Sequence, residues 1–180
     1  RNFLYHNRGD GTFTDVGLPS GTGYNRNGLP EGSMGVDFGD YNNDGWLDIF
    51  VTNSSLETNT LYKNNGDGTF TDATEIARLA QPSYLMLAFG TKFFDFDNDG
   101  DLDLFVANGH LQPDIERLDD YNTYAQNDQL YQNNGDGTYT EIGAALGGYF
   151  AERYVGRGAA FGDYDNDGDM DVFIVNSNQR

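Results

Sequence analysis

Alternating apolar and polar residues recur in short runs along the chain, and each run lies beside a glycine-rich turn. One element appears three times, as two alternating segments on either side of an Asn-x-Gly-Asp-Gly centre. Glycine and asparagine accept the positive φ angles that a tight reversal needs, so each copy predicts a β-hairpin. The three copies span residues 4–15, 61–72 and 130–141.

A second element also occurs three times and alternates with the hairpins. Each copy begins with a glycine (Gly35, Gly90 or Gly158), and five residues later an aspartate opens the pattern Asp-x-Asp/Asn-x-Asp-Gly-x-x-Asp. The segments that close the three patterns read LDIFV, LDLFV and MDVFIV, and such β-branched and aromatic runs favour buried strands. Because both elements recur in a fixed order at matched spacing, the sequence predicts a repeat protein.

The two elements together describe a four-stranded unit with an Asp loop between strands one and two. A unit of this kind is a propeller blade, so the predicted fold class is an all-β β-propeller built from four-stranded blades. Complete blades are expected at 33–75 and 88–143. A half blade at 1–16 would supply strands three and four, and another at 156–180 would supply strands one and two. We expect a single propeller segment.

Charge and composition narrow the classes of partner. The 180 residues include 29 Asp or Glu against 10 Lys or Arg, a formal net charge of −19 that repels phosphate backbones and anionic lipid. We therefore expect no nucleic-acid partner. No apolar run approaches the roughly 18 residues of a membrane span, so no membrane insertion is expected. The chain has no cysteine, which excludes disulfides and thiolate zinc sites.

The Asp loops have the composition of a calcium site. In the third loop Asp163, Asp165 and Asp167 hold alternate positions that can converge when the backbone wraps round one centre, and Gly168 permits the sharp turn. Calcium takes 6–8 hard oxygen ligands at about 2.3–2.6 Å. The twelfth position, where an EF-hand has its bidentate Glu, is Val or Ile in every copy. The ninth position must then close the site, and we expect side chains 1, 3, 5 and 9 with the carbonyl of 7.

This pattern resembles the calcium loops of FG-GAP or VCBS repeats, which form propeller blades in integrin α subunits and in many secreted bacterial proteins. Phe38-Gly39 and Phe161-Gly162 match the Phe-Gly of the name, whereas Phe93-Phe94 departs from it. The amino-acid sequences of the second and third repeats are also similar to the propeller of the UnbV/ASPIC (cartilage acidic protein-like) family. Members of that family typically carry further blades and a C-terminal ASPIC/UnbV segment.

The resemblance implies about three Ca²⁺ ions, one in each loop, with the seventh residue of each loop binding through its carbonyl. The implied ligand sets are Asp40, Asn42, Asp44, Trp46 and Asp48; Asp95, Asp97, Asp99, Asp101 and Asp103; and Asp163, Asp165, Asp167, Asp169 and Asp171. Asn42 is a neutral ligand where the other loops have Asp, and Trp46 replaces an acid. The first site is therefore predicted to be the weakest.

These observations favour a calcium-binding module that is extracellular, on the cell surface or periplasmic, with a structural role or a protein or glycan partner that the sequence does not name. Calcium is abundant outside cells, and extracellular modules tolerate affinities as weak as about 10⁻⁴–10⁻³ M. We do not expect an enzyme, because no Ser-His-Asp order or phosphate loop appears.

Two alternatives stay open. A propeller-based enzyme, such as a hydrolase or polysaccharide lyase, could use calcium or a carboxylate pair on its substrate. The terminal half blades are complementary, so self-association through them could build a head-to-tail filament, since exposed strand edges invite pairing.

Overall fold

The computed structural model describes residues 1–177, so the last three residues of the predicted half blade 156–180 lie outside the described residues. Within residues 1–177 the helices have three or four residues each: α1 (Ala80–Ser83), η1 (Ile115–Arg117), α2 (Gly143–Leu146) and η2 (Gly148–Ala151). None of these helices is long or apolar enough to cross a bilayer.

Twelve strands of the described chain form four separate antiparallel sheets. The N-terminal hairpin contains β1 (Tyr5–Asn7) and β2 (Phe13–Asp15), and the C-terminal hairpin contains β11 (Gly156–Gly162) and β12 (Asp171–Asn176). The first sheet contains β3 (Val36–Gly39), β4 (Asp48–Val51), β5 (Thr60–Asn64) and β6 (Phe70–Asp72). The second sheet contains β7 (Ala88–Phe94), β8 (Asp103–Asn108), β9 (Gln129–Asn133) and β10 (Tyr139–Glu141).

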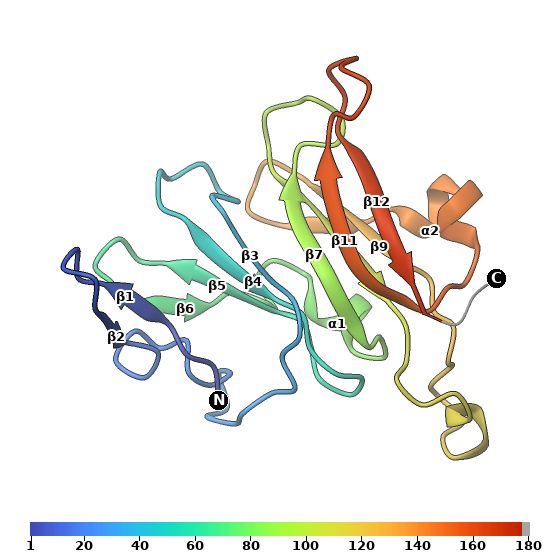
Figure 1. The fold of residues 1–180 in the computed structure, drawn as a ribbon, viewed down its shortest axis with the longest axis horizontal. Coiled ribbons are helices and arrows are strands. Elements are labelled where there is room, and N and C mark those ends of the chain that lie inside the picture. The colour runs from blue at the N-terminus through green and yellow to red at the C-terminus, as the bar shows by residue number, and fades with distance from the viewer. Residues whose placement is uncertain (178–180) are drawn as a thin grey trace.

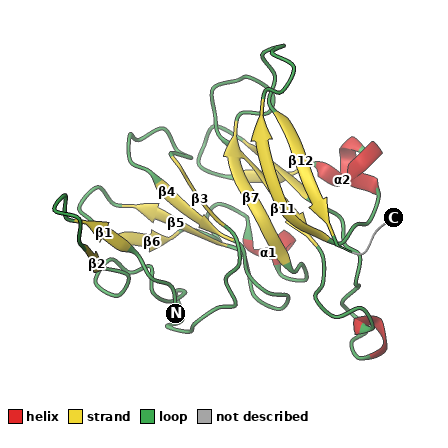
Figure 2. Ribbon diagram, viewed as in Figure 1, coloured by secondary structure: helices red, strands yellow, loops and turns green. Residues whose placement is uncertain are grey.

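Each four-stranded sheet is a meander in which consecutive strands pair, β3-β4-β5-β6 and β7-β8-β9-β10. The strands of the first sheet are labelled in Figures 1 and 2. This arrangement confirms the prediction of an all-β chain with antiparallel four-stranded units, and it is the arrangement of strands in a propeller blade. The registers repeat as well. Ile49 lies opposite Tyr62 in the first sheet, and Leu104 lies opposite Tyr131 in the second.

The core lies between successive sheets. Phe50 and Leu61 of the first sheet pack with Phe93, Leu104 and Val106 of the second, and all five are at most 4% exposed. Every residue of β4 and β8 is buried, because each of these strands has paired neighbours at both edges and other residues over both faces. The prediction that the strands after the Asp loops are buried therefore holds for these two.

The first strand of each repeat lies beside the first strand of the next. β3 contacts β7, and β7 contacts β11, so these strands form the line along which the sheets meet (Figure 1). β12 differs from β4 and β8, because among residues 1–177 no strand pairs with its outer edge. The residues of β12 are accordingly intermediate or exposed.

The departure from the Phe-Gly pattern has a packing reason. A Cβ at Gly39 would lie 2.6 Å from the ring of Phe93, so the first sheet needs glycine where that ring fits against it. In the second sheet Phe94 takes the place that Gly39 has in the first, and its ring lies 5.3 Å from that of Phe161. The Phe94 side chain therefore fills the space between the second sheet and the C-terminal hairpin, whereas the first sheet has a glycine at the equivalent position.

Candidate metal centres

The three Asp loops connect the first two strands of each repeat and share one backbone conformation. The asparagine at position 4 has a positive φ in all three loops, 56° at Asn43, 59° at Asn98 and 61° at Asn166. The glycine at position 6 follows with φ between 88° and 98°. Asparagine and glycine are the residues that accept this left-handed conformation at least cost. The loops are therefore bent by their own sequence.

The aspartate at position 1 fixes this bend with two hydrogen bonds. Asp95 accepts the backbone N–H of Asp99 at 3.1 Å and that of Gly100 at 2.9 Å, one on each carboxylate oxygen. Equivalent pairs of bonds reach Asp40 and Asp163 at 2.8–3.1 Å. The loop thus folds back over its first carboxylate, which draws positions 1, 3 and 5 together.

Two loops gather three carboxylates each. Asp95, Asp97 and Asp99 each offer an oxygen within 4.8 Å of the others, and Asp163, Asp165 and Asp167 do the same. The side chains are exposed or only partly buried. Four ion pairs join described residues, and the one that reaches an Asp loop is in the first loop. Three unpaired carboxylates this close repel one another, and a divalent cation with oxygen ligands would relieve that repulsion.

The ninth position has a second role that the sequence did not reveal. Asp103 is 1% exposed and accepts backbone N–H groups on both oxygens, from Asn133 at 2.7 Å and from Phe96 at 2.9 Å. Burial is the main cause that raises its pKa to about 6, and the two hydrogen bonds oppose the shift. Because Asn133 lies on β9, this carboxylate fastens the loop to the third strand of its own sheet.

Asp48 repeats this arrangement in the first sheet, with bonds from Asn64 and Tyr41 and a pKa raised to about 6, mainly by burial. Asp171 accepts the N–H of Tyr164 at 3.0 Å, and no described strand stands at the edge of β12 to supply the other bond.

The three-carboxylate groups comprise positions 1, 3 and 5. Binding of metal by position 9 stays a prediction. It is chemically possible, because a carboxylate that accepts two hydrogen bonds still has free lone pairs.

The seventh position joins neighbouring loops. The side-chain amide of Asn43 donates to Asp101 Oδ1 at 2.6 Å, and that of Asn98 donates to Asp169 Oδ1 at 3.0 Å. The position-7 carboxylate of each later loop is thus bonded to position 4 of the loop before it. This use of the side chain is compatible with the prediction that position 7 would bind metal through its carbonyl.

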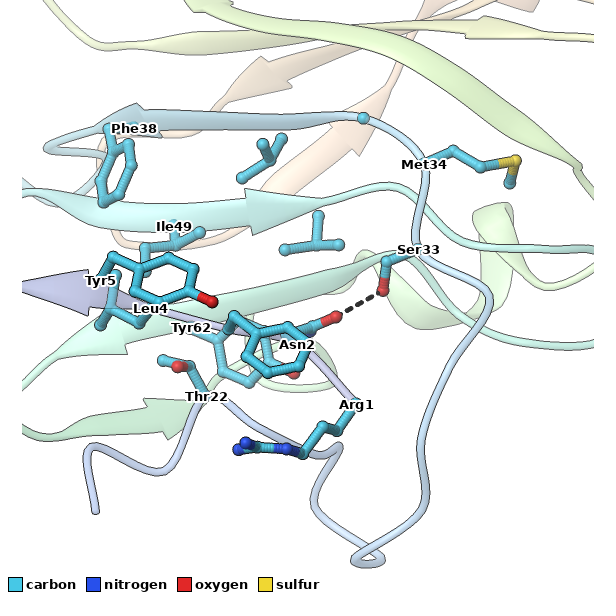
Figure 3. Close-up of a pocket in the computed structure, with 14 residues that line it drawn as sticks. Arg1, Asn2, Leu4, Tyr5, Thr22, Ser33, Met34, Phe38, Ile49 and Tyr62 are labelled. Carbon is cyan, nitrogen blue, oxygen red and sulfur yellow. Dashed lines mark hydrogen bonds between the residues drawn. The ribbon is translucent and has the colours of Figure 1, made fainter. Parts of the chain in front are cut away.

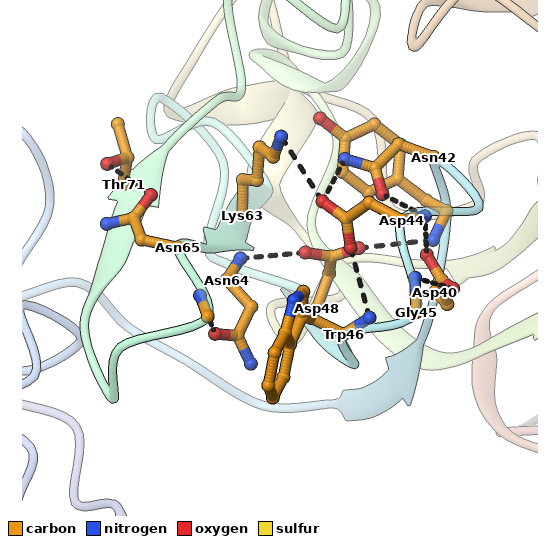
Figure 4. Close-up of polar contacts among 12 residues, drawn as sticks. Asp40, Asn42, Asp44, Gly45, Trp46, Asp48, Lys63, Asn64, Asn65 and Thr71 are labelled. Atoms are coloured by element: carbon orange, nitrogen blue, oxygen red, sulfur yellow. Dashed lines mark hydrogen bonds and ion pairs between the residues drawn. The ribbon is translucent and has the colours of Figure 1, made fainter.

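The first loop differs from the other two in its donors and its neighbours (Figure 4). Asn42 stands where the others have a carboxylate, and its amide donates to Asp44 Oδ2 at 3.0 Å. Lys63 of β5 also reaches Asp44 Oδ2, at 3.3 Å. Trp46 lies against the turn at Gly66, where a Cβ would be 2.9 Å from the indole nitrogen. The first loop therefore has fewer negative charges than the other two, and the ammonium group of a lysine on β5 lies beside it.

The Gly-Asp-Gly turns use their aspartates locally. Asp67 Oδ1 accepts both the backbone N–H and the hydroxyl of Thr69, at 3.0 and 2.6 Å, and Asp10 and Asp136 make the same pair of bonds in the other hairpins. The hydrogen bonds from threonine lower the pKa of all three carboxyl groups. These aspartates hold the hairpin turns and belong to neither three-carboxylate group.

Two clefts flank the sheets. One has a volume of about 510 Å³ and lies between the N-terminal hairpin and the first sheet, where Leu4, Phe38, Ile49 and Tyr62 line it (Figure 3). The other, of about 430 Å³, lies between the second sheet and the C-terminal hairpin and has no charged side chain in its lining. Both of these clefts are mainly apolar.

Comparison with known proteins agrees with this architecture. The FG-GAP-like repeat family matches residues 1–51, 40–106 and 95–174. The chain is 29% identical to cartilage acidic protein 1 of Xenopus tropicalis over 181 aligned residues and 30% identical to the human protein of that name over 179. Each alignment covers 96% of this chain and 24% of the relative, so the chain spans about a quarter of their length. With three matched repeats across most of its residues, the chain belongs to the FG-GAP-like repeat family.

Proposed function

We propose that this chain is a calcium-stabilised β-propeller segment that acts as an extracellular structural or interaction module. The observation that carries the proposal is the gathering of three carboxylates at the same place in two loops, with no ion pair to a described Lys, Arg or His. Calcium would be held by side chains at positions 1, 3, 5 and 9 and by the carbonyl of position 7.

Calcium in these loops would act on folding. Each ion would neutralise a carboxylate cluster and fix the turn between the first two strands of a repeat, so that binding energy stabilises the folded chain. An extracellular location would suit this role, because calcium is abundant outside cells and weak sites are filled there. Two relatives with "cartilage acidic protein" as their name agree with an acidic extracellular module.

We also propose a binding or structural role in place of catalysis. The clefts beside the two sheets are mainly apolar, and Arg1 is the charged residue in the lining of the larger of these two. Its guanidinium is paired with Asp15 at 2.8 Å and lies 4.5 Å from the centre of the Phe3 ring. The partner would be a protein or a glycan.

The proposal is tested by thermal unfolding with calcium and with EGTA. A site with calcium at 100 times its Kd stabilises the fold by about 2.7 kcal/mol. About 1 kcal/mol moves the Tm of a domain of this size by 2–4 °C, so filled sites predict a drop of about 10 °C or more on chelation. An unchanged Tm would contradict the proposal.

A pair of variants assigns the effect to the loops. Asp99→Asn removes one carboxylate from the second loop and is expected to reduce the drop on chelation. Asp136→Asn removes the same charge from a Gly-Asp-Gly turn and is expected to leave the drop unchanged. Calorimetric titration with calcium would show fewer or weaker sites in Asp99→Asn alone, and equal losses in both variants would contradict the assignment to the loops.

A further inference from the structure

Lys63 forms an ion pair with the first Asp loop. It is the fourth of the five residues of β5, and its ammonium group is 3.3 Å from Asp44 Oδ2, the carboxylate at position 5 of the loop (Figure 4). The two side chains are 40% and 31% exposed, so the contact is partly shielded from water. The ammonium therefore sits beside a carboxylate of the first candidate metal site.

The second sheet offers an internal comparison. Gln132 has the same place in β9 that Lys63 has in β5, one residue after the buried tyrosine, Tyr131 or Tyr62. Its amide donates to Asp97 Oδ2 at 2.9 Å, a carboxylate of the second loop. The residue at this strand position thus reaches a candidate metal ligand in both sheets. The difference between the two is one positive charge.

That charge works against a divalent ion. Calcium entering the first loop must either displace the ammonium from Asp44 or bind beside it, and both cost free energy. A charge of +2 and one of +1 about 5 Å apart repel by about 1.7 kcal/mol in water. Screening by salt reduces this repulsion to roughly 1–1.4 kcal/mol, which corresponds to about five- to tenfold in affinity.

We propose that Lys63 is a built-in counter-ion that sets the calcium affinity of the first loop, and that the residue at this strand position ranks the sites of successive repeats. This inference rests on the proposed calcium binding. It adds a cause for a weak first site that is distinct from Asn42 and Trp46, because it comes from another strand and can be changed without altering the loop.

The test exchanges the two residues. Lys63→Gln gives the first sheet the residue of the second, and Gln132→Lys makes the opposite change. Trp46 is the one tryptophan of the sequence and lies within the first loop, so terbium emission excited through tryptophan reports on that loop. Calcium competition against terbium then gives the affinity of the first site, and calorimetry gives the sum over all sites.

We expect Lys63→Gln to bind calcium about five- to tenfold more tightly in the first loop than the unchanged protein, with the same number of sites. We expect Gln132→Lys to weaken one of the other sites by a similar factor. Thermal unfolding in EGTA would show that both variants fold. A first-loop affinity that does not change in Lys63→Gln, while the unchanged protein binds calcium, would overturn the inference and leave the proposed function standing.

Lys92→Gln is the matched control, because Lys92 is the other lysine of the sequence and its ammonium is also 3.3 Å from a carboxylate, Asp37 Oδ1. It makes the same change in net charge on β7, outside the Asp loops. An equal gain in Lys92→Gln would show a general charge effect and overturn the inference. If no variant binds calcium or terbium, and chelation leaves the Tm unchanged, the proposed function itself fails.

Discussion

Asp128 shows at the scale of one residue how similar repeats can hold different charges. It precedes β9 and accepts the backbone N–H of Asn108 at 2.7 Å, as Asn59 accepts that of Asn53 at 2.9 Å before β5. Asp128 is 1% exposed, and burial raises its pKa against the opposing hydrogen bonds from Tyr149 and Asn108. One repeat thus buries a carboxylate where the other buries a neutral amide.

Asp128→Asn is therefore expected to stabilise the chain near neutral pH. A raised folded-state pKa means that the contribution of Asp128 to stability is greatest below the ordinary value of 3.8 and falls as pH rises through the folded pKa. The variant lacks this fall, so its Tm in EGTA should be about 2–4 °C higher at pH 7.5, for a gain of about 1 kcal/mol. The difference should shrink toward pH 4, and a less stable variant at pH 7.5 would contradict the prediction.

At the scale of elements, the glycine five residues before an Asp loop lies in, or directly before, the first strand of its repeat. At Gly35 and Gly90 the chain comes close to the first strand of the next repeat. A Cβ at Gly35 would overlap the carbonyl oxygen of Phe89, and one at Gly90 would lie 2.5 Å from the backbone nitrogen of Ala159. Thr52 Oγ1 donates to that same Phe89 carbonyl at 2.7 Å. A Cβ at Gly158 would meet nothing within 4 Å, because no described residue lies on the side toward which it would point.

Alanine at these glycines gives a graded prediction. Gly35→Ala and Gly90→Ala force neighbouring backbones apart and are expected to cost about 3 kcal/mol or more, or to prevent folding. Gly158→Ala should stay within about 0.5 kcal/mol of the unchanged protein. Urea unfolding of the three variants would measure the differences. A large loss in Gly158→Ala would show that another strand covers this position in solution.

At the scale of the whole molecule, the two terminal hairpins expose surfaces that the complete sheets bury. Tyr5 of β1 is 60% exposed, whereas Tyr62 and Tyr131 at the equivalent places are each 1% exposed. Phe173 of β12 is 71% exposed, whereas Phe50 at its equivalent place is fully buried. The edges of β1 and β12 correspond to strands three and two of a blade, which pair in both complete sheets.

This correspondence predicts that the 180-residue chain associates head to tail, with β12 of one copy beside β1 of the next. Light scattering should give a mass that grows with protein concentration. Phe173→Glu should reduce that growth, because it places a charge on the surface to be buried. Leu118→Glu, at a residue 67% exposed in the linker before β9, is the matched control. A monomeric mass at every concentration would contradict association.

The sequence determined by itself the features whose hydrogen bonds are local. The second Asp loop bends because the carboxylate of Asp95 accepts the backbone N–H groups of Asp99 and Gly100, only four and five residues away. A hairpin turn closes because the carboxylate of Asp67 accepts the backbone N–H of Thr69. Such contacts depend on spacing and residue type, so the repeats, the loops and the four-stranded units were all readable from the pattern of residues. The gathering of positions 1, 3 and 5 follows from the same local bend.

Only the tertiary structure decided what each repeat presents to its neighbours. The bond from Asn43 to Asp101 spans 58 residues, and the close approach of Gly35 to Phe89 spans 54. The ion pair of Lys63 with Asp44 depends on which face of β5 lies toward the loop. Spacing along the chain leaves these contacts open, because they are set by the packing of one sheet on the next and by the twist that brings a strand over a loop.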